Sequence, residues 1–312
     1  MANEVLAVLI HFNLAAAAAT LAVLILRQPV RRRFGAQVAY QLWSGVPIAA
    51  LCALLPPAQA TRIVPPGEGP HFDPIFMASQ GLAHAPSGLL LTLWLWGAVA
   101  SMVIVAACQL RFLSLARRGL AGPAVAGVFA PRVIMPRDSE AQFTTEERVL
   151  IRAHERAHID RGDPRANGMI ALGQCLFWFN PLIHLAARTA RLDQELACDA
   201  QVLAHRSGQR RRYAETLLKT QLGAVAAPLG CHWLAGHAAH PLEQRIQALR
   251  QPAPDFKRQD HGAIALACAL VIAAYGAWRA QPSAPAEGFV PDDYPVAEAH
   301  HMQAIIVPPI RL

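Results

Sequence analysis

Charged residues are scarce in this chain. Only 16% of its 312 residues are Asp, Glu, Lys or Arg, whereas 54% are hydrophobic. Soluble proteins carry about 25% charged residues, so the composition argues against an ordinary soluble protein. Four stretches hold at most one charge each, and a transmembrane helix needs about 20 apolar residues. We therefore predict four transmembrane helices, at about residues 5–26, 37–56, 88–110 and 261–279. A buried helix of a soluble domain is the alternative for the last and shortest.

Three further absences limit the function. The six cysteines include no CxxC pair, so free thiols are expected rather than a cysteine-rich zinc site. No positive charge precedes the first apolar stretch, which favours an uncleaved membrane anchor over a signal peptide. No helix-turn-helix or zinc-finger signature accompanies the net charge of +7, so we expect no direct nucleic-acid binding.

The distribution of basic residues predicts the topology, because loops rich in Lys and Arg stay in the cytoplasm. Basic residues follow the first and third apolar stretches and precede the fourth, at Arg27, Arg31, Arg32, Arg33, Arg111, Arg117, Arg118, Lys257 and Arg258. This pattern predicts a membrane region over 1–110 and a cytoplasmic domain over 111–260. The N-terminus and a short Pro-rich tail over 280–312 are then extracytoplasmic.

The sequence His154-Glu155-Arg156-Ala157-His158 is an HExxH motif. Thr144 and Glu147 form a capping-box pattern that predicts a helix beginning at about Thr145. In that helix the two histidines leave the same face one turn apart, so both can reach one Zn²⁺. Glu155 can take a proton from a metal-bound water molecule. A chance match to this pattern has odds of roughly 2% in a chain of this composition.

A third metal ligand is expected from a second helix. The run 182–205 has helical periodicity, and Asn180 and Pro181 are a good start signal. Glu195 and Asp199 are four residues apart and share one face of this helix. We predict Glu195 as the third zinc ligand and Asp199 as the carboxylate that orients a ligand imidazole. The alternative is two acidic residues on a solvated helix face.

The motifs HERAH, FNPL (179–182) and ELACD (195–199), set among hydrophobic stretches, resemble the BlaR/MecR-type family of membrane zinc metallopeptidases. The similarity covers most of 89–249. It implies that His154, His158 and Glu195 bind zinc, that Glu155 is the general base, and that Asp199 supports a ligand. It also implies a gluzincin-like domain, mainly α-helical with a small β element, in the inner membrane of a bacterium.

The resemblance implies a regulatory endopeptidase that cleaves a cytoplasmic transcriptional repressor, itself, or both. Members that sense antibiotics carry a large penicillin-binding domain after the last membrane helix. We expect that domain to be lacking here, because about 33 residues follow the fourth apolar stretch. Two alternatives stay open: an HtpX-like quality-control protease, and a non-enzymatic signalling scaffold with a vestigial zinc site. A genuine structural zinc would normally have four protein ligands.

Overall fold

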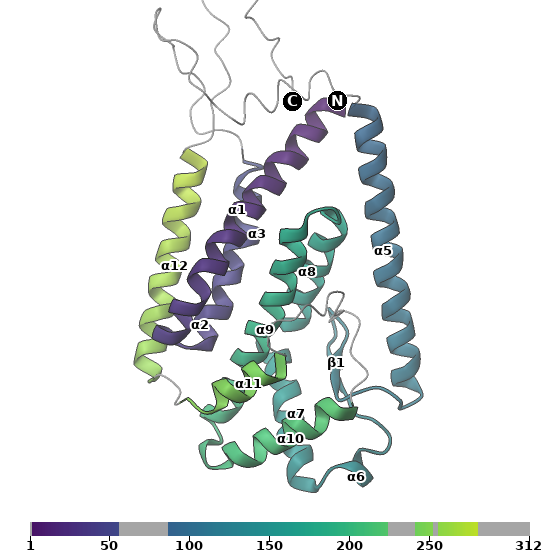
Figure 1. Cartoon of the computed structure of the whole chain (residues 1–312), viewed down its shortest axis with the longest axis vertical. Coiled ribbons are helices and arrows are strands. Elements are labelled where there is room, and N and C mark those ends of the chain that lie inside the picture. The colour runs from purple at the N-terminus through teal and green to yellow at the C-terminus, as the bar shows by residue number, and fades with distance from the viewer. Residues whose placement is uncertain (1, 56–86, 224–240, 252–254, 280–312) are drawn as a thin grey trace, which may run out of the picture.

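The computed structural model describes residues 2–55, 87–223, 241–251 and 255–279. These residues form a mainly helical protein with one small sheet, which confirms the predicted fold class (Figure 1). The predicted tail over 280–312 lies outside the described residues.

Three of the described helices are long and apolar enough to cross a membrane. They are α1 (Ala2–Phe34), α5 (Ser87–Arg117) and α12 (Phe256–Arg279). The second membrane helix that we predicted, at 37–56, is helical but divided into α2 (Ala36–Gln41), the 3₁₀ turn η1 (Leu42–Ser44) and α3 (Gly45–Cys52). Gly45 and Pro47 lie at the last junction, and neither favours a continuous helix. A second membrane crossing at this place stays a prediction.

A small hairpin follows α5. Strands β1 (Ala124–Ala126) and β2 (Arg132–Ile134) pair antiparallel, with Val125 opposite Val133. Gly127 begins the connecting loop with a φ of 96°, and a Cβ at this residue would lie 2.6 Å from a backbone oxygen. Only glycine fits there, so this residue fixes how the hairpin loop turns.

The next helices carry the HExxH motif. The short α6 (Ser139–Gln142) leads to α7 (Thr145–Asp160), which begins with the predicted capping box of Thr144 and Glu147. Glu147 also accepts a hydrogen bond from Lys219 of α10 (Arg210–Gly223), and the turn η2 (Ser207–Gln209) precedes α10. The capping box therefore starts α7 and also joins it to α10.

A helical hairpin follows α7 and lies between α1 and α5 (Figure 1). Its arms are α8 (Asp163–Leu176) and α9 (Pro181–Ala204). Asn180 caps α9 as predicted, because its side chain accepts a hydrogen bond from the Leu182 amide at 2.9 Å. The last short helix, α11 (Pro241–Leu249), packs against α9 and α10.

The hydrophobic core is divided into clusters that meet on α9. One joins α9 to α7, α10 and α11 and includes Leu150, Cys198 and Tyr213. The other two join α9 and the turn before it to α1, η1 and α3, for example through Trp43 and Ile183. Helix α9 is therefore the element that connects the membrane helices with the helices around the motif.

Candidate metal centre

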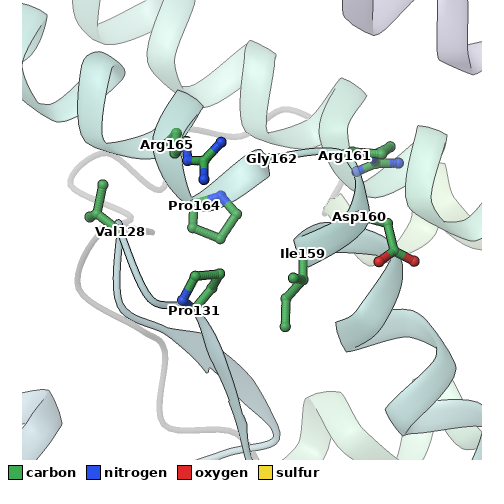
Figure 2. Close-up of a pocket in the computed structure, with 8 residues that line it drawn as sticks. All are labelled: Val128, Pro131, Ile159, Asp160, Arg161, Gly162, Pro164 and Arg165. Carbon is green, nitrogen blue, oxygen red and sulfur yellow. The ribbon is translucent and has the colours of Figure 1, made fainter.

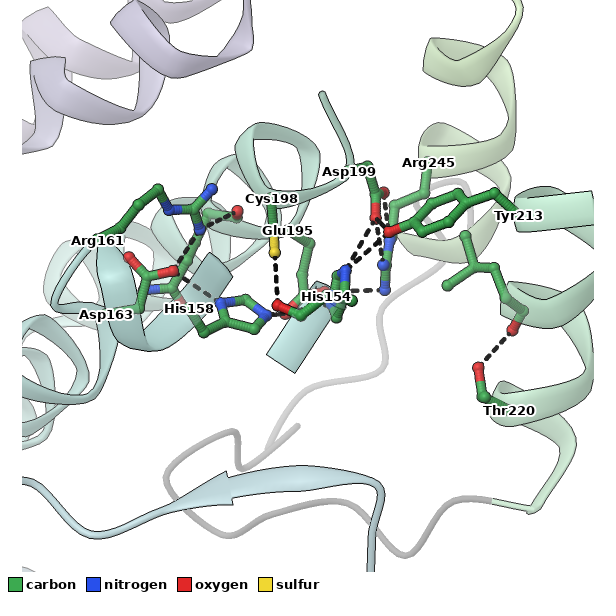
Figure 3. Close-up of polar contacts among 12 residues, drawn as sticks. His154, His158, Arg161, Asp163, Glu195, Cys198, Asp199, Tyr213, Thr220 and Arg245 are labelled. Carbon is green, nitrogen blue, oxygen red and sulfur yellow. Dashed lines mark hydrogen bonds and ion pairs between the residues drawn. The ribbon is translucent and has the colours of Figure 1, made fainter. Parts of the chain in front are cut away.

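The described structure brings the three predicted zinc ligands together between α7 and α9 (Figure 3). The Nε2 atoms of His154 and His158 are 3.1 Å apart. The carboxylate of Glu195 lies 3.3 Å from Nε2 of His154 through Oε2 and 3.5 Å from Nε2 of His158 through Oε1. Two imidazole nitrogens and one carboxylate group from two helices thus face one point.

These separations fit a tetrahedral zinc ion. Bonds of about 2.0–2.1 Å at tetrahedral angles place neighbouring ligand atoms about 3.3–3.4 Å apart. The distances among the three residues, from 3.1 to 3.5 Å, bracket that value. His154, His158 and Glu195 could therefore hold one zinc ion with little movement of their side chains.

The second nitrogen of His154 is held by a pair of polar groups. Its Nδ1 lies 2.8 Å from the Tyr213 hydroxyl and 3.4 Å from Oδ1 of Asp199. The Tyr213 hydroxyl donates to the same Asp199 oxygen at 2.6 Å, so it accepts from Nδ1–H of His154. This network favours the tautomer that leaves Nε2 free for a metal. Asp199 therefore acts on His154 both directly and through Tyr213.

His158 has a partner that the sequence analysis missed. Its Nδ1 lies 2.7 Å from Oδ2 of Asp163, and Asp163 is 1% exposed. The Arg161 guanidinium also binds Asp163. Gly162, with a φ of 74°, ends α7 and turns the chain so that Asp163 returns to the last helical turn. The sequence offered one signal for this contact: Gly162, a residue that can end a helix, lies just after the motif and is followed directly by Asp163.

Arg245 of α11 neutralises the carboxylates of the centre. Its Nε and Nη2 donate to the two oxygens of Asp199 at 2.8 and 2.7 Å, and its Nη1 lies 2.9 Å from Oε2 of Glu195. Burial alone would raise the pKa of Asp199, but the charge and hydrogen bonds of Arg245, together with His154, outweigh burial and hold that pKa well below its usual value. Sequence analysis missed Arg245 because a single arginine in a short helix carries no metal-site signature.

Glu155 and Cys198 are the other reactive side chains near the centre. Glu155 is buried, and burial raises the pKa of its carboxyl group while the neighbouring histidines oppose this effect. Cys198 is fully buried and its Sγ donates to the His154 carbonyl oxygen at 3.2 Å. The donor atoms of His154, His158 and Cys198 lie within 4.8 Å of one another, so the thiol is a further possible metal donor.

A cavity of about 270 Å³ lies beside the turn between α7 and α8 (Figure 2). Val128 and Pro131 of the β-hairpin loop form one wall, and Ile159, Asp160 and Pro164 form the opposite one. Since Ile159 directly follows His158, the cavity adjoins the end of the motif helix.

Together, the fold and these residues define a helical membrane protein with a possible metal-binding group beneath its membrane helices. The chain matches the BlaR1 peptidase M56 family over residues 7–118 and 113–249, and it belongs to that family. It is 32% identical over 98 residues to the regulatory protein BlaR1 of Bacillus licheniformis, covering 31% of this chain and 16% of that protein.

It is also 27% identical over 101 residues to the methicillin resistance mecR1 protein of Staphylococcus aureus, covering 32% of this chain and 17% of that protein. The chain thus matches less than a fifth of the length of these curated relatives. No solved structure matches it.

Proposed function

We propose that this protein is a membrane-bound zinc endopeptidase with Glu155 as its general base and His154, His158 and Glu195 as its metal ligands. The observation that supports the proposal best is that the two Nε2 atoms lie 3.1 Å apart and that the Glu195 carboxylate has one oxygen within 3.3 Å of the first and the other within 3.5 Å of the second. A catalytic zinc site has three protein ligands of this kind and one open position. Family membership supports the same class of enzyme.

The residues of this chain perform the proton transfers and hold the site. When bound, zinc lowers the pKa of a water molecule to about 7 and polarises the peptide carbonyl. Glu155 takes the proton of the attacking water and passes it to the leaving amine. Its raised pKa suits a group that must both accept and release a proton near neutral pH. Asp163 and Asp199 keep the two imidazoles in the required orientation.

The biological role that we propose is proteolytic signalling. The names of the relatives describe a regulatory protein and a resistance protein. We infer that this chain cuts a cytoplasmic transcriptional repressor, or its own chain, after a signal reaches the membrane region. The domain around the centre then faces the cytoplasm, and the protein resides in the inner membrane with its N-terminus outside.

A structural zinc site is the second candidate, and Cys198 is the observation that favours it. If the thiol bound the metal together with His154, His158 and Glu195, four protein ligands would close the site and leave no position for water. Replacing Cys198 with Ala tests this alternative. An undiminished affinity for zinc in that variant excludes a closed four-ligand site.

The main experiment compares zinc content and peptide-bond cleavage in detergent-purified wild type, Glu155→Gln and His154→Ala. Glu146→Gln is the matched control, because Glu146 lies in the first turn of the same helix. We expect about one zinc per chain in all but His154→Ala, and cleavage only in wild type and the control. Cleavage by purified Glu155→Gln contradicts the assignment of the base, and wild type without zinc contradicts the whole proposal.

A further inference from the structure

The tip of the α8–α9 hairpin contacts α1 and α5 far from the charged ends of those helices. On α1, Asn13 accepts a hydrogen bond at 2.7 Å from the side chain of Asn180. Its neighbour Phe12 stacks on Phe177, with ring centroids 5.3 Å apart. On α5, the Trp94 indole donates to the Leu176 carbonyl at 2.8 Å. The tip is therefore fixed to two separate membrane helices.

The position of these contacts along α1 and α5 gives the depth of the tip. Asn13 precedes Arg27, the first charge after the apolar stretch of α1, by 14 residues (27 − 13), which is about 21 Å of helix. Trp94 precedes Arg111 of α5 by 17 residues (111 − 94), or about 25 Å. Even a helix tilted by about 40° would place Asn13 roughly 16 Å above the charged level, in a hydrocarbon core about 30 Å thick.

A second contact between α1 and α9 checks this depth independently. Both oxygens of Asp193 on α9 lie 3.0 Å from Nη1 of Arg27. From Asn180 to Asp193 is 13 residues (193 − 180), against 14 from Asn13 to Arg27. The two helices thus run in the same direction, and their two contacts are separated by nearly the same length on each helix. Asp193 therefore lies level with Arg27, and the first charge on α9, Arg188, follows Asn180 by 8 residues (188 − 180), or about 12 Å of helix.

The composition of the hairpin suits a hydrocarbon environment. Residues 166–187 contain no Asp, Glu, Lys or Arg. The side chains that point outward are apolar, and the exposed large ones are Met169, Leu172, Trp178, Phe179 and Leu185. The half-buried polar side chains near the tip are hydrogen-bonded within the hairpin: Gln174 lies 3.2 Å from Nδ1 of His184, whose Nε2 lies 2.9 Å from the Trp178 carbonyl oxygen. Paired polar groups and outward apolar groups are what a bilayer requires.

We propose that the α8–α9 hairpin is a re-entrant element of the membrane region, and that Phe179 and its exposed apolar neighbours contact lipid acyl chains. The helix that carries Glu195 then begins inside the bilayer. The hairpin enters the bilayer without crossing it, because the chain turns back at 177–180. This inference does not depend on the proposed peptidase activity.

Photo-crosslinking of the full chain tests the proposal. Benzoylphenylalanine replaces Phe179 in protein reconstituted into vesicles of phosphatidylcholine and phosphatidylglycerol, and adducts are identified by mass after irradiation. The same replacement at Leu95, an exposed residue of α5, reports a membrane-spanning surface. The same replacement at Arg211 of α10, whose side chain is 94% exposed, reports a surface in water.

We expect the Phe179 variant to form lipid adducts in a yield within about twofold of the Leu95 variant and at least tenfold above the Arg211 variant. A yield equal to that at Arg211 overturns the proposal, because the tip then faces water. Adducts to protein in place of lipid also overturn it, because another part of this chain or a second copy then covers the tip. Size-exclusion elution and zinc content of each variant show that the protein remains folded.

Discussion

Arg27 of the first membrane helix and Asp193 of the metal-site helix form an ion pair in which Nη1 lies 3.0 Å from both carboxylate oxygens. Asp193 is 1% exposed, and the Trp43 indole donates a further hydrogen bond to it at 2.9 Å. Glu195 follows two residues later. The geometry of the metal site is therefore tied directly to the charged end of α1.

Asp193→Ala is expected to destabilise the folded protein by about 3–5 kcal/mol, because it leaves the Arg27 charge buried without a partner. The double variant Arg27→Ala/Asp193→Ala should lose less than the sum of the two single variants. Thermal and denaturant unfolding in detergent measure both effects. Glu215→Ala, which removes the exposed ion pair with Arg211, is the control and should change little. Additive losses would mean that the pair makes no specific contribution.

Arg245→Ala should cost more stability without zinc than with it. In the metal-free protein the Arg245 charge is the partner of both Glu195 and Asp199, and its removal leaves the buried Asp199 and the partly exposed Glu195 without it, at a cost of about 3–5 kcal/mol. A bound zinc ion supplies a second positive charge at Glu195, so part of this loss disappears. Arg245→Lys keeps the charge but not the paired hydrogen bonds and should fall between.

The measurement for Arg245 is the unfolding midpoint of each variant with and without saturating zinc. Arg250→Ala is the control, since this residue lies just after α11 and is exposed. An equal loss in both conditions would show that the role of Arg245 is confined to packing. An unchanged midpoint would show that the carboxylates are neutralised in another way.

Metal affinity should rise with pH across the neutral range. Burial would lower the pKa of His158, but the Glu195 charge and the Asp163 hydrogen bond outweigh it and raise that pKa to about 10 in the metal-free protein. At neutral pH a proton must therefore leave His158 when the metal binds. Each displaced proton strengthens apparent binding about tenfold per pH unit.

Competition with a metal chelator from pH 6 to 10 measures this slope. Asp163→Asn removes one of the groups that raise the pKa of His158, so its slope should flatten at a lower pH than that of the wild type while the protein still binds zinc. A slope of zero near pH 7 in the wild type would mean that His158 is already neutral. A slope that flattens at the same pH in both proteins would mean that Asp163 does not control the protonation of His158.

Phe179→Asp should destabilise the protein in a bilayer by up to about 2.5–3.5 kcal/mol, the range for an acidic side chain at the centre of the hydrocarbon core. Val149→Asp is matched to it, because Val149 is an equally exposed apolar residue of α7, outside the membrane helices. Unfolding midpoints in lipid nanodiscs compare the two. Equal effects at both positions would argue that the tip of the hairpin is in water.

Local signals predicted the two helices of the site. The capping box of Thr144 and Glu147 and the Asn180-Pro181 start both begin helices where expected. The sequence alone could assign the two histidines to one metal ion, because on a single helix their spacing determines which face each side chain leaves. Glu195 was placed from its spacing to Asp199 and from the family motif, and the structure brings it to 3.3 Å from His154.

The remaining parts depend on contacts between distant segments, which no local pattern encodes. Tyr213 and Arg245 come from α10 and α11, and each reaches Asp199 only after those helices pack on α9. The apolar residues of the run 169–179 do not reveal that the chain turns back between α1 and α5. The roles of the site residues and the predicted domain boundaries stay predictions.

Arg245 lies 46 residues beyond Asp199 in the chain. During synthesis, His154, Glu195 and Asp199 are all made before the guanidinium that balances the carboxylates exists. The newly made site is therefore electrically incomplete and reaches its final charge only when α11 docks. This order of assembly delays completion of the charged cluster until α11 has left the ribosome.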